Sequence, residues 1–123
     1  MQSLTVVLLQ GDGAVAQSLF SALSKGFSSV QQVHSLDELR NRIAKNRAQV
    51  AILDIEAAPL SEIQHLSRDF PGAWIVCTHR VADEEMWAAA LRAGAADVFP
   101  ANDIPGIVRA AMTNIGREYS AVA

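Results

Sequence analysis

The stretch "AQVAILDIEAAP", residues 48–59, says most about the fold. Its apolar run Val50–Leu53 is unbroken by polar residues, which is typical of a strand covered on both faces of a sheet. The run ends in Asp54, and the later stretch "WIVCTH", residues 74–79, repeats the pattern and ends in Thr78. Two such strands separated by a helical segment predict a parallel sheet.

The same alternation of short apolar strands and amphipathic helices runs through all 123 residues. Two helix starts match the capping box, "SLDE" at residues 35–38 and "SEIQ" at residues 61–64. The chain therefore predicts one α/β domain: a five-stranded parallel sheet, order 2-1-3-4-5, with helices on both faces. Its core spans about residues 4–117, and residues 118–123 are a tail or the start of a linker. The expected strands are Leu4–Leu9, Val30–His34, Gln49–Asp54, Trp74–Thr78 and Ala96–Phe99.

Composition narrows the classes of partner. With 13 acidic and 10 basic residues the net charge is −3, so no basic surface is expected for nucleic acid or for a membrane. The single cysteine excludes a disulfide within the chain, and the first residues lack the positive charge of a secretory signal. We expect a cytoplasmic protein.

Polar residues gather where the strands end. In an open parallel sheet, ligands bind beyond the carboxyl ends of the strands, at the point where the strand order reverses. There the first strand is followed by Asp12 and the third ends in Asp54, while Thr78 lies on the neighbouring strand. Two carboxylates beside a hydroxyl indicate a site for a hard cation such as Mg²⁺ together with a phosphoryl group.

The loop after the first strand allows two other interpretations. The motif "GDGAVA", residues 11–16, fits the G-x-G-x-x-A pattern of a dinucleotide-binding loop, so a small flavodoxin-like nucleotide-binding domain using Gly11, Asp12 and Gly13 is one alternative. Against it, the second strand ends in "QVHSL" without the acidic residue that holds a ribose. Asp12 can also be a turn residue that bonds to the backbone near it.

Three segments together resemble the receiver domain of bacterial two-component response regulators, the CheY-like family. They are the two strands quoted above and "AALRAGAADVFPAND", residues 89–103, and the resemblance extends from residue 4 to about 117. It implies that Asp54 stands at the phosphoacceptor position and Thr78 at the hydroxyl that contacts the phosphoryl group. It also implies a signalling role and no enzyme activity. The implied partners are a histidine kinase or phosphotransfer protein, a downstream output domain or protein, and a second copy bound through the fourth helix, fifth strand and fifth helix.

Three of the chain's departures from the family pattern bear most on phosphorylation and its readout. Gly11 stands where receivers carry a metal-binding acid, which leaves Asp12, Asp54 and the Glu56 carbonyl for a weakened Mg²⁺ site. Ala101 replaces the lysine that pairs with the phosphoryl group, and Val98 replaces the aromatic switch residue. We therefore predict an atypical receiver that acts through protein–protein interaction, with phosphorylation at Asp54 impaired or lost. The alternative is a receiver still phosphorylated at Asp54 with Mg²⁺ and a histidine kinase.

Other side chains give smaller expectations. Glu56, His79 and Arg80 follow the strand ends and are predicted to modulate the pocket, with Glu56 and Arg80 forming an ion pair across it. Cys77 and Met86 are expected in the core. Trp87 is expected to be a half-exposed packing residue, with anchoring of a partner as the alternative.

Overall fold

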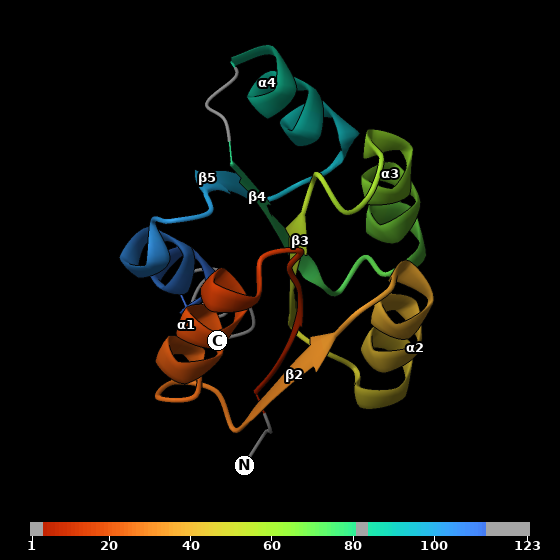
Figure 1. The fold of residues 1–123 in the computed structure, drawn as a ribbon. Coiled ribbons are helices and arrows are strands. Elements are labelled where there is room, and N and C mark those ends of the chain that lie inside the picture. Colours follow the sequence, from red (N-terminus) through yellow and green to blue (C-terminus); the bar gives the residue numbers. More distant parts are fainter. Residues whose placement is uncertain (1–3, 81–83, 113–123) are drawn as a thin grey trace, which may run out of the picture.

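A computed structural model describes residues 4–80 and 84–112. Five parallel strands form one sheet in the order β2-β1-β3-β4-β5, as predicted (Figure 1). The strands begin and end within about one residue of the expected positions, and the remainder of the predicted core and the tail lie outside the described residues. The strands are β1 Thr5–Leu9, β2 Ser29–Val33, β3 Val50–Asp54, β4 Trp74–His79 and β5 Asp97–Pro100.

The helices connect successive strands. They are α1 Gly13–Leu23, α2 Leu36–Asn46, α3 Leu60–Asp69 and α4 Glu84–Ala93. A further helix over residues 104–112, called the C-terminal helix below, follows β5. In the described part of the chain no helix has the length and apolar character needed to cross a membrane.

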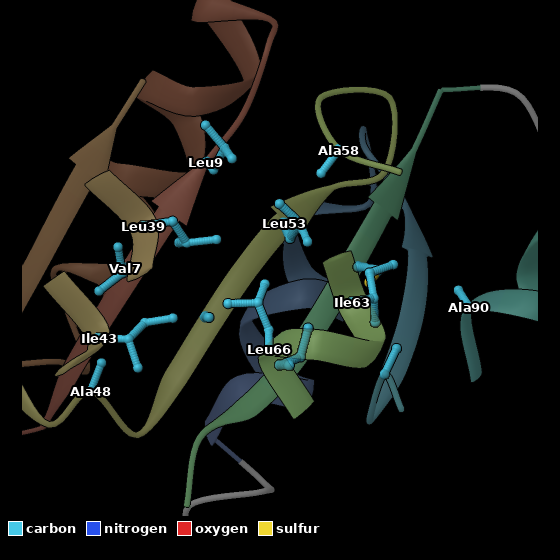
Figure 2. Packing of buried hydrophobic residues seen from close by; sticks show 14 of the residues in the cluster. Val7, Leu9, Leu39, Ile43, Ala48, Leu53, Ala58, Ile63, Leu66 and Ala90 are labelled. Atoms are coloured by element: carbon cyan, nitrogen blue, oxygen red, sulfur yellow. The ribbon is translucent and has the colours of Figure 1, made fainter. Parts of the chain in front are cut away.

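Two apolar layers cover the sheet. On one face α2, α3 and α4 pack against the strands, and Figure 2 shows Leu39 and Ile63 there beside Leu53 of β3. On the other face α1 and the C-terminal helix cover a second cluster that contains Leu8, Ile52 and Ile107. Because β1, β3 and β4 lie between these layers, both faces of each strand are buried, which explains their unbroken apolar sequences.

The two predicted capping boxes have different outcomes. At α2 the prediction is confirmed: Ser35 Oγ accepts a hydrogen bond from the Glu38 N–H at 3.1 Å. At α3 it is wrong, because the helix begins at Leu60 with Pro59 as N-cap and no capping side chain. The fixed backbone of Pro59, at φ −70°, starts the helix early and leaves the serine of "SEIQ" inside its first turn.

The end of α4 shows why a glycine follows it. Gly94 has φ +119°, a conformation that L side chains rarely adopt, and a Cβ there would lie 2.5 Å from Ser67 Oγ on α3. This glycine ends α4 as expected and lets α4 pack closely against α3. One expectation for α4 is wrong. Met86 is 38% exposed, because it lies in the outward-facing first turn of the helix and not over the sheet.

Candidate functional site

The candidate site lies at the carboxyl edge of β3 and β4. Asp54 is the last residue of β3, and the parallel register places it directly beside Thr78 of β4. Both side chains are buried, with exposed fractions of 4% and 0%. The sheet itself therefore brings the predicted acceptor carboxylate and the predicted hydroxyl to neighbouring positions.

Two backbone amides hold the Asp54 carboxylate. The Gly11 N–H donates to Oδ2 at 3.1 Å, and the Glu56 N–H donates to Oδ1 at 2.9 Å. Hydrogen bonds to an ionised oxygen are about twice as strong as neutral ones, so these amides stabilise the carboxylate in place. Each of its oxygens thus has a donor supplied by the protein backbone.

The missing side chain at Gly11 permits this close approach. A Cβ built on Gly11 would lie 3.2 Å from Asp54 Oδ2, which is tighter than most real contacts of that atom. The position where the receiver pattern has an acid is thus filled by a peptide N–H directed at the carboxylate. Gly11 therefore leaves this position without a charged side chain and lets the backbone N–H approach the carboxylate closely.

Gln10 is the pocket residue that the sequence interpretation did not single out. It is 7% exposed, and its Nε2 donates to Thr78 Oγ1 at 2.6 Å across 68 positions of sequence. An uncharged amide therefore ties the end of β1 to β4. In the sequence, Gln10 is a polar residue that comes immediately after a fully apolar strand and directly before Gly11.

Asp12 caps the first helix. Its Oδ1 accepts from the N–H groups of Ala14 and Val15, at 2.9 and 3.3 Å, and it is the exposed N-cap of α1. This is the turn interpretation that the sequence left open. Within residues 4–80 and 84–112, no group of three or more histidine, cysteine or acidic residues is arranged to hold a metal ion. The Mg²⁺ site of Asp12, Asp54 and the Glu56 carbonyl stays a prediction.

The β5 side of the pocket is uncharged. Ala101 is 8% exposed, and its N–H donates to the His79 carbonyl at 2.8 Å. Val98 is buried in the apolar cluster that α2, α3 and α4 cover. No lysine or arginine among the described residues bonds to Asp54. His79 is also buried, and its Nδ1 has no hydrogen-bond partner in the described structure.

Comparison with known proteins identifies the architecture. No family model and no curated protein matches the chain. The structure does match solved structures of response regulators. An orphan response regulator of H. pylori aligns with a TM-score of 0.80 at 16% identity, covering 91% of this chain and 96% of that one. The signal receiver domain of a response regulator from Bacteroides fragilis aligns at 0.81 and 17% identity, covering 92% and 97%. The chain has the fold of a response-regulator receiver domain.

A third match has the same fold and an atypical mechanism of its own. It is described as an atypical orphan response regulator with a phosphorylation-independent regulatory mechanism, and it aligns at a TM-score of 0.79 and 16% identity, covering 90% of this chain and 94% of that one. At this identity the likeness shows the receiver fold alone.

At the mouth of the receiver pocket, the predicted ion pair between Glu56 and Arg80 forms. Arg80 Nη1 lies 3.7 Å from Glu56 Oε2, and the two side chains are 64% and 44% exposed. Exposed pairs contribute about 0–1 kcal/mol, because water screens them and two long side chains lose freedom. The pair links the loops after β3 and β4 without holding them firmly.

Cys77 lies on β4 in the core, as expected. Burial disfavours the charged thiolate and raises the pKa of this thiol to about 12. At neutral pH the thiol is therefore protonated, and Cys77 acts in the receiver fold as a small apolar residue.

Proposed function

We propose that this domain is a signalling receiver that acts through protein–protein contact, with Asp54 no longer serving as a phosphate acceptor. The observation that carries the proposal is the pair of backbone N–H groups on the two oxygens of Asp54, at 3.1 and 2.9 Å. They keep the carboxylate satisfied within the protein.

Aspartyl phosphorylation makes demands that this pocket meets poorly. An oxygen of the carboxylate has to attack phosphorus, and positive charge has to neutralise the transferring group. The hydrogen bonds from Gly11 and Glu56 stabilise the two oxygens and so weaken each of them as a nucleophile. Ala101 offers no cation from β5, and Arg80, the charged residue nearest in sequence to the end of β4, is exposed and paired with Glu56.

The hydroxyl on the other side of the pocket is also engaged. Thr78 accepts a 2.6 Å hydrogen bond from Gln10, and both residues are buried. In this proposal the Gln10–Thr78 bond holds β1, β3 and β4 in a single arrangement. The signalling state is then set by packing and by the bound partner, and an added phosphate has no role in it.

The partner in this proposal is an output domain or a downstream protein, bound in the bacterial cytoplasm. A second copy, paired through α4, β5 and the C-terminal helix, is the other candidate partner. The domain itself carries out no catalysis and binds no nucleic acid, in keeping with its acidic balance of 13 to 10 charged residues.

The test is phosphorylation with a small-molecule donor. The domain is incubated with acetyl phosphate and Mg²⁺, and its mass is measured by intact mass spectrometry, with Asp54→Asn as the control. We expect no phosphoryl adduct on the wild type. The double variant Gly11→Asp/Ala101→Lys, which restores one acid and the lysine, is expected to show one that disappears when Asp54→Asn is added. A stoichiometric adduct on wild-type Asp54 would establish the alternative, a phosphorylatable receiver using Mg²⁺ and a histidine kinase.

The nucleotide-binding alternative meets a specific obstacle at α1. A phosphate at this helix start would need the Ala14 and Val15 N–H groups, which already bond to the Asp12 carboxylate. The negative charge of Asp12 would also repel the phosphate. A thermal shift by ATP, NAD or flavin at millimolar concentration would support this alternative, and we expect none.

A further inference from the structure

A groove outside the pocket lies between α1 and the C-terminal helix. It is an open, shallow depression of about 510 Å³, and its lining is almost entirely apolar. Figure 1 shows the two helices side by side on the same face of the sheet. The lining includes Ala22, Ile104, Pro105 and Val108, with Lys25 and Arg109 also contributing to it.

Two basic side chains give the groove a positive charge. Lys25 and Arg109 are exposed, and neither side chain forms a hydrogen bond or ion pair with any residue in the described part of the chain. An occupant that complements the groove therefore combines a large apolar side chain with a carboxylate nearby.

The chain presents such a combination on α4. Trp87 is 45% exposed, and Glu84 is exposed one turn before it. Residues three apart share one face of a helix, so the indole and the carboxylate project together. The helix is held to the sheet layer through Ala90, which is fully buried, and its outer face remains accessible.

The two surfaces cannot meet within one chain. α4 packs in the layer with α2 and α3, whereas the groove belongs to the layer of α1 and the C-terminal helix on the other face of the sheet. In Figure 1, α4 stands at the top, well away from α1. Complementary surfaces that are separated in this way can meet only between different molecules.

We propose that α4 of one copy docks in the groove of a second copy, with Trp87 against the apolar lining and Glu84 facing Lys25 and Arg109. This contact differs from pairing through α4, β5 and the C-terminal helix, because the receiving surface is made with α1. It does not depend on whether Asp54 accepts phosphate. One helix in one groove buries less than a standard interface, so the association is weak and transient.

Sedimentation velocity over a range of protein concentrations tests the contact. We expect the weight-average mass of the wild type to rise with concentration toward about 1 mM, the range of weak interfaces, and to fall when salt is added. Trp87→Ala is expected to abolish the rise. Glu84→Lys alone and Lys25→Glu/Arg109→Glu alone are also expected to remain monomeric, because each places like charges on both surfaces.

The decisive measurement mixes the two charge-reversed proteins. Acidic α4 then meets a basic groove, and basic α4 meets an acidic groove, so association is expected to return. Lys45→Glu on the exposed surface of α2 is the matched control and is expected to associate like the wild type. All substituted positions are exposed, and equal melting temperatures verify folding.

Two results would overturn the proposal. One is a wild type that stays monomeric at every concentration, which would leave the groove to a segment of a different protein. The other is an association that persists in each charge-reversed variant alone, because the contact would then lie elsewhere on the surface.

Discussion

The two sides of the receiver pocket have different chemistry. On the β3–β4 side the chain has a carboxylate and a hydroxyl, Asp54 and Thr78, both buried and in register. The β1 and β5 sides present an amide, a backbone N–H and a methyl group, from Gln10, Gly11 and Ala101. The first side matches the receiver pattern, whereas these three residues give the second side no charged group.

The difference shows which parts of the pocket the fold can keep without its charged partners. The Asp54 carboxylate stays buried because peptide groups and not cations satisfy it. Gln10 keeps Thr78 satisfied in the same way. A buried carboxylate and a buried hydroxyl at the strand ends are therefore both satisfied by neutral donors.

Restoring a charge on the β1 side is expected to have the largest effect. Gly11→Asp places a second carboxylate next to Asp54, since a Cβ at this position lies 3.2 Å from Oδ2. We expect a loss of about 2–3 kcal/mol in the free energy of unfolding, measured by urea denaturation without divalent cations. The loss should shrink with Mg²⁺ and in an Asp54→Asn background; a loss unchanged by either would show that the two groups do not interact.

Removing the charge on the β3 side is expected to cost slightly less. Asp54→Asn replaces one acceptor oxygen by an NH₂ group that faces the N–H of Gly11 or Glu56. Because one charge-assisted hydrogen bond is lost, we expect the free energy of unfolding to fall by about 2 kcal/mol, measured by thermal or urea denaturation. Asp37→Asn on the exposed start of α2 is the control and should change the free energy of unfolding by about a few tenths of a kcal/mol. An Asp54→Asn protein as stable as the wild type would contradict the role given to the two amides.

The neutral link between the two sides comes next in size. Gln10→Ala removes the 2.6 Å bond and leaves the buried Thr78 hydroxyl without its partner. We expect a loss of about 1–2 kcal/mol, against less than about 0.5 kcal/mol for the exposed Gln32→Ala on β2. A double-mutant cycle with Thr78→Val isolates the coupling energy between the two side chains. A coupling energy near zero would show that the Gln10–Thr78 bond does not stabilise the protein.

The smallest effect is expected at the mouth of the pocket. Arg80→Ala breaks a 3.7 Å pair between exposed side chains, so we predict a change below about 0.5 kcal/mol, with Arg42→Ala on α2 as control. Salt titration of the wild type should show an equally small dependence. A cost above about 1 kcal/mol would mean that the pair holds the two loops and does not merely bridge them.

The sequence by itself determined the architecture of this protein. Unbroken apolar strands alternating with amphipathic helices specify a parallel sheet covered on both faces, and the observed strand order agrees. These signals are local and periodic, so they can be read without coordinates. The capping box at Ser35 was readable for the same reason, whereas at α3 the preceding Pro59 overrode a similar pattern.

Only the tertiary structure decided the partners within the pocket. Gln10 and Thr78 are 68 positions apart, and Gly11 and Asp54 are 43 apart, so no local pattern shows that they bond. The loop after β1 contains several polar groups, and sequence could not tell which of them turns inward. In the fold, Asp12 lies at the start of α1, where its carboxylate satisfies exposed backbone amides. Gln10 and the Gly11 N–H lie in the pocket, where buried polar groups need hydrogen-bond partners from neighbouring strands.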